Sequence, residues 1–342
     1  MVNFNFYRKR SFGLDLGNTN TLINDQHSIL MTQPSYIAFH KNTKQVKAVG
    51  DSAYSMFEKT HEDLQSVKPL RGGVIADFES ASEMIRTMLQ QAFPETSMIK
   101  RYDHIISGIP YATTEVERRA LRSALDQFHA HHTHLVYEPL AAALGMGLNI
   151  AEPNGKMVVD IGGGITEIVV ISLSGIASFN AVKVAGDTFD MEIQDYFRKQ
   201  YGMAIGIKTA EQIKIKVGAV LENIEFPPEP VQVVGKSIQD GIPVSRNVGH
   251  KEIANVLDKF FNTIEYNIVQ TMESCSPELA GDIYENGIYV TGGGALLRGL
   301  KERFESRIKV DVHIDEQPLI AVSKGVSKTL GDPRKFRSVL FE

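Results

Sequence analysis

The sequence predicts an α/β protein built from two similar lobes. Residues 13–22 and 158–166 share one pattern, in which an apolar run carries an aspartate and leads into a glycine-containing turn and a threonine. β-Branched apolar runs bounded by glycines indicate buried strands. The repeat favours two related halves, although two unrelated hairpins are an alternative. The aligned pairs are Asp15 with Asp160, Gly17 with Gly162, and Thr21 with Thr166.

Length and composition agree with more than one globular domain. The chain has 342 residues, of which 43% are hydrophobic and 23% charged, so we expect at least two folded domains and little disorder. The net charge of −5 argues against nucleic-acid binding. The single cysteine, Cys275, excludes an intrachain disulfide and suits a reducing cytoplasm. We expect neither a signal peptide nor a transmembrane segment.

The glycine turns predict a phosphate site. Gly162, Gly163 and Gly164 lie between two strands, where backbone N–H groups can approach an anion closely. Asp160 ends the preceding strand and is a candidate for holding a hydrated cation beside that anion. The first hairpin repeats the arrangement with Asp15 and Gly17, and its turn offers polar side chains to phosphate oxygens. These side chains belong to Asn18, Thr19 and Asn20. The two halves would therefore face one another across a nucleotide.

The rest of the first lobe alternates strands and helices. Residues 34–73 resemble a small inserted subdomain, with short strands at 36–39 and 46–49. A helix ending near Ala92 follows, then a strand at 104–110 and a helix from Thr114 to about Phe128. A strand from Val136 leads to a helix rich in small residues, which can pack closely against another helix, as at a hinge between the halves.

Glu117 has two interpretations. Thr114 and Glu117 have the spacing of a capping box, in which the glutamate bonds back to the first residue of the helix. A carboxylate just after a strand-end turn is also well placed to polarise a water that attacks a terminal phosphate. The two roles are compatible, and the sequence does not separate them.

Three features at the ends of elements are also ambiguous. Residues 1–10 combine aromatic residues with three cations, which suits either an anionic membrane surface or an ordinary terminus leading into a strand. Phe93 is either a lipid contact or a packed loop aromatic. His129, His131, His132 and His134 are interpreted as a polar turn, because no cysteine or matched carboxylate accompanies them to bind a metal.

The second lobe adds two more glycine turns. Gly186 follows a strand and opens a helix, so its N–H can face a phosphate, while Asp187 or Thr188 caps that helix. Gly292, Gly293 and Gly294 follow another strand and offer a backbone contact to phosphate or adenosine. Glu211 and Lys214 are at helical spacing, as either surface residues or contacts to ribose and purine. A long helix is expected from Lys251 to about Ser274.

Several motifs together resemble the actin/Hsp70/sugar-kinase superfamily and, within it, the MreB family of bacterial actin homologues. They are Gly-Leu-Asp-Leu-Gly-x-x-Asn-Thr-Leu (13–22), Gly-Val-Ile-Ala-Asp-Phe-Glu (73–79), Thr-Glu-Val-Glu-Arg-Arg-Ala (114–120), Glu-Pro-x-Ala-Ala-Ala (138–143), Asp-Ile-Gly-Gly-Gly (160–164), Thr-Ala-Glu-Gln-Ile-Lys-Ile (209–215) and Thr-Gly-Gly-Gly-Ala-Leu-Leu-Arg-Gly-Leu (291–300). They span almost the whole chain.

The resemblance implies an actin-like ATPase fold, with two duplicated ribonuclease-H-like lobes, each bearing a small inserted subdomain, and a nucleotide in the cleft between. Lobe I is expected at residues 1–33 and 74–150 with an insertion at 34–73, and lobe II at 151–187 and 250–342 with an insertion at 188–249. The resemblance further implies that ATP or ADP binds together with Mg²⁺, which Asp15 and Asp160 hold through water. It also implies a pair of residues that position the attacking water, and this pair corresponds to Glu117 and Thr166.

The resemblance also implies partners. It predicts head-to-tail protofilaments of this chain, paired on the inner face of the cell membrane, that act with a rod-shape membrane adaptor and the cell-wall elongation machinery. The chain departs from the family at Asn18 and Thr19, where Thr-Ala is usual, and at Ile165, where threonine is usual. The loss of that threonine would slow hydrolysis. A nucleotide-dependent scaffold that does not hydrolyse ATP is therefore kept as an alternative. A sugar or acetate kinase of the same fold is the less favoured alternative, because Glu117 and the compact insertions argue against it.

Overall fold

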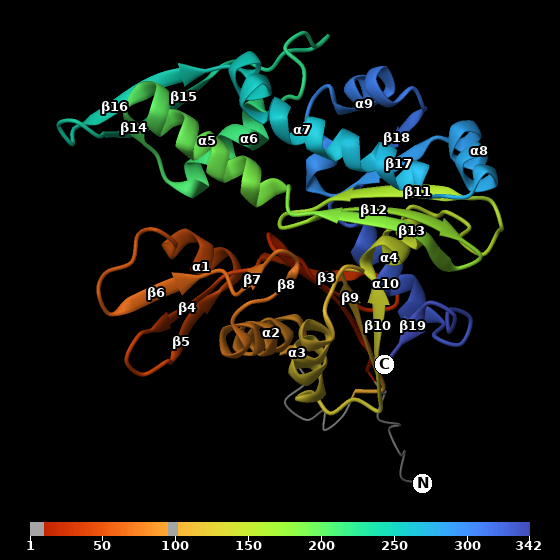
Figure 1. Cartoon of the computed structure of the whole chain (residues 1–342). Helices are drawn as coiled ribbons and strands as arrows, with labels where there is room; N and C mark the ends of the chain where they lie inside the picture. The colour runs from red at the N-terminus through yellow and green to blue at the C-terminus, as the bar shows by residue number, and fades with distance from the viewer. Residues whose placement is uncertain (1–9, 95–101) are drawn as a thin grey trace. The chain divides into compact units, whose positions relative to one another are not determined.

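The computed structural model describes residues 10–94 and 102–342, which form two compact units (Figure 1). Unit 1 contains the described residues up to Asn149 together with Ile320–Glu342, and unit 2 contains Ile150–Leu319. We expected the whole of 250–342 in the second lobe, and the structure places 320–342 in the first instead. The reason is long-range packing, described below.

A six-stranded sheet organises unit 1. The strand order is β19-β10-β9-β1-β2-β3, in which β1, β9 and β10 run parallel and the other neighbours are antiparallel. β1 is buried along its whole length, as its apolar run predicts. The strands are β1 (Phe12–Leu16), β2 (Asn20–Asn24), β3 (Ile29–Pro34), β9 (His104–Ile109), β10 (His132–Tyr137) and β19 (Leu340–Phe341).

Helices α2 (Phe78–Ala92) and α3 (Glu115–Asp126) share an apolar core with this sheet. Phe12 lies at the centre of that core and contacts Phe93, whose side chain is only 8% exposed. Phe93 is therefore a packed loop aromatic, the second of the two interpretations. Residues 1–9 and 95–101 lie outside the described residues, and with them most of the segment considered for membrane contact.

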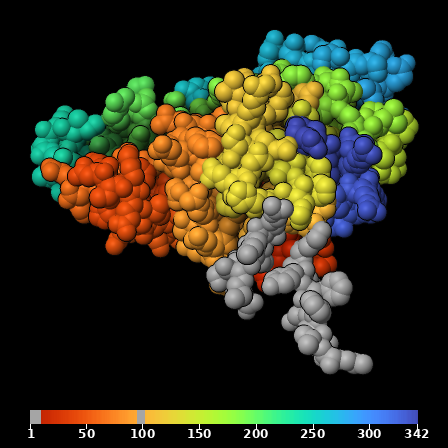
Figure 2. Space-filling view, turned by 90° about the horizontal axis from the view of Figure 1, so that it is seen from below, coloured from red at the N-terminus to blue at the C-terminus, as the bar shows by residue number. Residues whose placement is uncertain are grey.

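Two small-residue helices explain why the C-terminal residues join unit 1. Helix α4 (Glu138–Gly145) packs on α10 (Ala321–Gly331). An ideal Cβ on Gly145 would lie 1.9 Å from the Ala321 carbonyl oxygen, and one on Gly325 would lie 1.8 Å from that of Ala141. The close packing that we expected of α4 is confirmed, but its partner lies in the same unit. In Figure 2 the blue C-terminal residues lie against the yellow segment of this unit.

The 34–73 region forms a separate three-stranded sheet in the order β5-β4-β6. Tyr36, Ala38 and Ala53 form a small core of their own beneath α1. A two-stranded ribbon follows and returns the chain to α2. The elements are β4 (Ile37–His40), β5 (Val46–Val49), α1 (Gly50–Met56), β6 (Leu64–Val67), β7 (Leu70–Arg71) and β8 (Val74–Ile75).

Unit 2 is built on a five-stranded sheet in the order β13-β12-β11-β17-β18. Buried phenylalanines from α5, α7 and α9 (Phe189, Phe261 and Phe304) join one core with this sheet. The elements are β11 (Lys156–Ile161), β12 (Thr166–Ser172), β13 (Gly175–Val182), α5 (Gly186–Tyr201), α6 (Ile207–Val217), α7 (His250–Glu273), α8 (Pro277–Asn286), β17 (Ile288–Thr291), η2 (Gly293–Leu296), α9 (Leu300–Ile308) and β18 (Val312–Ile314). Strands β14 (Met203–Ala204), β15 (Val231–Ser237) and β16 (Pro243–Val248) form a small sheet.

The two main sheets repeat one topology. Strands β3-β2-β1-β9-β10 of unit 1 correspond in order and direction to β13-β12-β11-β17-β18 of unit 2. The register matches as well, because Leu16 pairs with Thr21 and Ile161 pairs with Thr166. The duplication predicted from the two hairpins is therefore confirmed for five strands of each sheet, and β19 of unit 1 has no counterpart in unit 2.

The predicted polar turn holds for His129 and His131, which lie in the connection before β10, and is wrong for His132 and His134. His132 and His134 lie on β10, and their rings stack with His104 of β9 at centroid distances of 4.8 and 6.3 Å. Thr133 and Leu135 between them are buried, so the alternation of a strand was present in the sequence.

Among the helices of residues 10–94 and 102–342, none is long and apolar enough to cross a membrane.

Candidate functional site: two aspartate–glycine turns

The turn of unit 1 is supported by side chains. The Ser35 hydroxyl donates to the Gly17 carbonyl at 2.6 Å and lies 2.9 Å from the Thr21 hydroxyl. The Asn18 side-chain oxygen accepts a bond of 2.8 Å from the Gly73 N–H, and Asn18 is only 4% exposed. The amide that we expected to face phosphate therefore ties the turn to the β7–β8 ribbon. Thr19 and Asn20 are half-buried.

The turn of unit 2 is supported by a helix N-terminus. The Gly162 N–H donates to the Ile165 carbonyl at 3.1 Å, which closes the turn. The first two N–H groups of α5 then bind it from outside, since Gly186 donates to Gly162 at 3.0 Å and Asp187 donates to Gly163 at 2.7 Å. The Gly186 N–H that we expected to face a phosphate thus holds the turn instead.

The cap expected on α5 is also absent in the described chain. Ala185 occupies the cap position and makes no side-chain cap bond, whereas the Thr188 hydroxyl donates to the Lys183 carbonyl at 3.1 Å. Asp187 lies in the first turn, where a carboxylate interacts favourably with the helix dipole.

Thr166 and Ile165 have different surroundings. Thr166 is fully buried, and its hydroxyl donates to the Val184 carbonyl at 2.6 Å. Ile165 lies in the turn itself and is half-buried. The buried hydroxyl therefore joins β12 to the segment before α5, while the side chain in the turn is apolar.

The two aspartates lie at equivalent strand positions and are both buried. Asp15 is 8% exposed and Asp160 is 9% exposed. Burial raises the pKa of Asp160 to about 6. Within residues 10–94 and 102–342 no group donates a hydrogen bond to the Asp160 carboxylate. A carboxylate without such compensation is costly when charged, and a nearby cation would offset that cost.

The third glycine turn packs directly against Asp160. Gly292 has a φ of +80°, and an ideal Cβ there would lie 2.3 Å from the Asp160 Oδ1 atom. An ideal Cβ on Gly294 would lie 2.2 Å from the Ile161 side chain, whereas one on Gly293 would meet nothing closer than 3.5 Å. Gly292 and Gly294 thus allow η2 to approach the end of β11, and Gly293 faces open space.

The residue types fit a magnesium site. Mg²⁺ prefers oxygen ligands, keeps several waters and usually uses one or two carboxylates. The buried Asp160 carboxylate, which accepts no hydrogen bond within the described residues, is consistent with that chemistry. In the described parts of the chain, no three His, Cys, Asp or Glu side chains are grouped to hold a metal directly.

Lys214 links α6 to the start of α5. Its ammonium donates to the Gly186 carbonyl at 3.1 Å and to the Asp190 carboxylate at 2.9 Å. Burial raises the pKa of Asp190 to about 6 although Lys214 lowers it, and Glu211 and Asp187 lie near enough to raise it further. Lys214 therefore supports the α5 N-terminus and, through it, the glycine turn.

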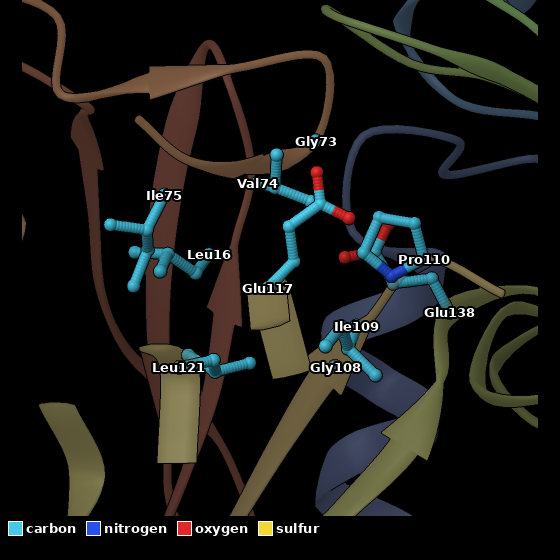
Figure 3. Close-up of a pocket in the computed structure, with 10 residues that line it drawn as sticks. All are labelled: Leu16, Gly73, Val74, Ile75, Gly108, Ile109, Pro110, Glu117, Leu121 and Glu138. Atoms are coloured by element: carbon cyan, nitrogen blue, oxygen red, sulfur yellow. The ribbon is translucent and has the colours of Figure 1, made fainter. Parts of the chain in front are cut away.

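A pocket in unit 1 brings Glu117 and Glu138 together (Figure 3). The Thr114 N–H and hydroxyl donate to one Glu117 oxygen at 2.7 and 2.8 Å, and the Glu117 N–H donates back at 3.3 Å. The capping box is confirmed. The same carboxylate extends toward Val74 and Pro110 in Figure 3, so it also lines the pocket.

Glu138 is a residue that the sequence analysis missed. It directly follows β10 and begins α4, and an ideal Cβ on Gly108 would lie 3.3 Å from its Cγ atom. Its position just after a parallel strand is the same signal that drew attention to Glu117, and it was available in the sequence.

Comparison with known proteins now identifies the family. A family model described as MreB/Mbl protein matches residues 9–338. The chain belongs to the MreB/Mbl family. It is 37% identical over 327 residues to the cell shape-determining protein Mbl of Bacillus subtilis (strain 168), covering 95% of this chain and 97% of that protein.

Two solved structures have the same fold as this chain. MreB 5 of Spiroplasma citri bound to AMPPNP superposes with a TM-score of 0.89 at 35% identity, covering 96% of this chain and 98% of that one. The MamK double helical filament gives a TM-score of 0.76 at 18% identity, covering 93% and 97%, and so shares the fold. The actin-like ATPase fold expected from the sequence is therefore confirmed.

Proposed function

We propose that this chain binds ATP with Mg²⁺, hydrolyses it slowly and polymerises into filaments that help set rod cell shape. The observation that carries the proposal is the repeated turn, in which a buried aspartate precedes a glycine bend in each unit. The AMPPNP bound to the related Spiroplasma protein and the cell-shape role of Mbl support it.

In the proposed complex, the bends of both units bind the phosphates of one nucleotide. Their backbone can approach the anion closely because Gly17, Gly162, Gly163 and Gly164 carry no side chains, although the Gly162 N–H is already bound to the Ile165 carbonyl. Asp15 and Asp160 would hold Mg²⁺ through water, and the ion would neutralise charge on the phosphate oxygens. Gly292, Gly293 and Gly294 would contact the adenosine, and Glu211 the ribose or purine.

Water activation is assigned to the acidic pocket of unit 1. Glu117 and Glu138 both line it, and either carboxylate can accept a proton from an attacking water. Glu117 also accepts two bonds in its capping box, and Glu138, which lines the same pocket, is the second candidate. On unit 2 the Thr166 hydroxyl is engaged with Val184 and Ile165 has none, so we propose weak water positioning there and slow turnover.

Phosphate release separates these roles. We expect Glu117→Gln to keep the capping box, because glutamine also serves there, and to reduce phosphate release by on the order of 10²-fold or more. Glu138→Gln is the matched variant in the same pocket. If only Glu138→Gln lowers release while both variants bind ATP equally, Glu117 is a cap alone.

Ile165→Thr tests the rival scaffold. A hydroxyl in the turn should raise phosphate release above that of the unmodified chain, with unchanged ATP affinity. Release that is undetectable in the unmodified chain, while ATP still drives sedimentation, would favour a scaffold that binds nucleotide without turning it over. Failure to bind ATP at all would overturn the proposed function.

Membrane attachment and pairing of protofilaments are parts of the same proposal. We propose that the filaments lie on the inner membrane surface and act with a rod-shape membrane adaptor and the cell-wall elongation machinery. Liposome co-sedimentation of the whole chain and of a chain lacking residues 1–10 tests the terminus. Equal binding of the two would remove residues 1–10 from the proposal.

A further inference from the structure

A buried arginine in unit 2 joins three segments of the chain. Arg303 on α9 is only 3% exposed, and its Nε donates to the Glu265 carboxylate of α7. Nη1 donates to Asp258 at 2.8 Å and to the Val220 carbonyl at 3.0 Å, and Nη2 donates to Asn262 at 2.9 Å. The Val220 bond is different from the others, because it reaches the segment that follows α6 rather than α7.

That segment is paired with the chain that follows η2. The Val220 N–H donates to the Arg298 carbonyl at 2.9 Å, and Ala219 and Arg298 form an isolated parallel bridge. An ideal Cβ on Gly218 would lie 2.6 Å from the Leu297 side chain, so the glycine allows this close approach. The end of α6 and the exit of η2 thus form one backbone unit, and Arg303 binds it from the core side.

We propose that Arg303 is a positioning residue that fixes α6 against the η2 turn and so shapes the adenosine half of the nucleotide site. The inference rests on the proposed function, in which Glu211 on α6 and Gly292–Gly294 contact ribose and base. The hydrogen bonds of Arg303 go to α7 and to Val220, and within the described residues none reaches the glycine bends proposed to bind phosphate. Its loss should therefore weaken binding of the nucleoside far more than binding of the phosphates.

The chemistry of the guanidinium suits this task. Arginine presents five donors in a planar fork, so one side chain can bind Val220 and three positions of α7 at once. Lysine keeps the positive charge beside Glu265 and Asp258 but is a single point donor on a flexible stem. Arg303→Lys should therefore keep the positive charge in the core and lose the simultaneous hydrogen bonds to Val220 and α7.

The test compares two ligands, Mg-ATP and Mg-tripolyphosphate, by calorimetry on the full chain. For Arg303→Lys we expect the ATP dissociation constant to rise by about tenfold and the tripolyphosphate constant by less than about twofold. The matched control is Phe304→Leu, which disturbs the neighbouring core position and keeps the Arg303 side chain that donates to the Val220 carbonyl. It should leave the ratio of the two constants unchanged.

A second variant covers the case in which Arg303→Lys does not fold. Arg303→Met combined with Glu265→Leu removes both buried charges, which is often tolerated, and still deletes the Val220 bond. Equal losses for ATP and tripolyphosphate in a folded variant, or a ratio shifted as much in Phe304→Leu, would overturn the inference. An unmodified chain that binds neither ligand would instead refute the proposed function.

Discussion

The two glycine turns have the same strand pairing and opposite means of support. In unit 1 a hydroxyl, that of Ser35, holds the Gly17 carbonyl. In unit 2 the backbone N–H groups at the start of α5 hold the Gly162 and Gly163 carbonyls. A backbone donor is present whatever the side chain, whereas a serine can be lost by one substitution. The duplicated sheet therefore preserved the turn and not the contacts that stabilise it.

The two aspartates also differ in the segment that follows the neighbouring parallel strand, which is β17 in unit 2 and β9 in unit 1. Gly292 of the η2 turn packs closely against Asp160, while in unit 1 the corresponding strand β9 ends at Ile109 and leads into Pro110. A close backbone approach at the carboxylate is thus a feature of unit 2. We expect unit 2 to be the less tolerant of added atoms at its turn.

The largest effect is predicted for Gly292→Ala. Alanine at a φ of +80° is strained, and its Cβ would meet Asp160 Oδ1 at 2.3 Å and the Ile161 carbonyl at 2.5 Å. We expect a loss of about 2–4 kcal/mol in the free energy of unfolding of unit 2, together with loss of ATP binding. Urea unfolding followed by circular dichroism, and calorimetry with ATP, measure the two effects.

Gly293→Ala is the matched control for this prediction. Its φ is not in the left-handed region, and the nearest atom to an added Cβ is 3.5 Å away on Leu319. We expect a change within about 0.5 kcal/mol, as for most substitutions away from packed sites. If the two variants lose stability equally, the close approach of η2 to Asp160 is not what makes Gly292 necessary.

The paired threonines give the next effect. Thr166→Val leaves the carbonyl of the half-buried Val184 without its 2.6 Å donor and should cost about 1–2 kcal/mol. Thr21→Val should cost less than about 1 kcal/mol, because the Ser35 hydroxyl still donates to Gly17 after the change. Urea midpoints of both variants decide the order. A larger loss for Thr21→Val than for Thr166→Val would contradict the idea that the turn of unit 2 depends more on its threonine hydroxyl than the turn of unit 1 does.

Local patterns in the sequence were sufficient for the hairpins. An aspartate between β-branched residues and a glycine turn specify a buried strand end, so β1–β2, β11–β12 and the burial of Asp15 and Asp160 follow from short segments. The capping box at Glu117 follows in the same way, because residues three apart on a helix start are neighbours.

Long-range packing was not predictable from those segments. The last helix joins unit 1 because Gly145 and Gly325 permit close contact between α4 and α10. A local sequence pattern does not specify which helix will pack against another. The Gly186 N–H was assigned to a phosphate because a helix N-terminus attracts anions, but the Gly162 carbonyl of the turn occupies it. A partner distant in the sequence decided the outcome in both cases.

A smaller effect is predicted for Ser35→Ala in unit 1. The substitution removes the donor to the Gly17 carbonyl and should cost about 0.5–1.5 kcal/mol in the free energy of unfolding. Because unit 2 holds its own turn with backbone donors, Ser35→Ala should leave the turn at 161–166 unchanged. Amide hydrogen exchange of residues 16–20 and 161–166 compares the turns. Faster exchange at 161–166 as well would contradict independent support.

The smallest predicted effect is a loss of stability at acidic pH, which we expect in unit 1 rather than in unit 2. In unit 1 the rings of His104, His132 and His134 stack, whereas in unit 2 a single imidazole, His313, stacks on Tyr289 at 5.1 Å. Burial lowers the pKa of His134, and the nearby His132 and Arg122 lower it further, against a raising effect of Glu342.

The sign of the pH dependence follows from that lowered pKa. In the unfolded chain His134 takes up its proton near its ordinary pKa of about 6.5, and in the folded chain it does so only at a lower pH. The unfolded state therefore binds more protons as the pH falls below about 6.5, so unit 1 loses stability until the folded pKa has been passed. His134→Gln should flatten this loss, measured as urea midpoints at pH 7.5 and 5.5 with hydrogen exchange on β9 and β10. An unchanged slope in that variant would mean that the stacked histidines do not set the acid sensitivity of this sheet.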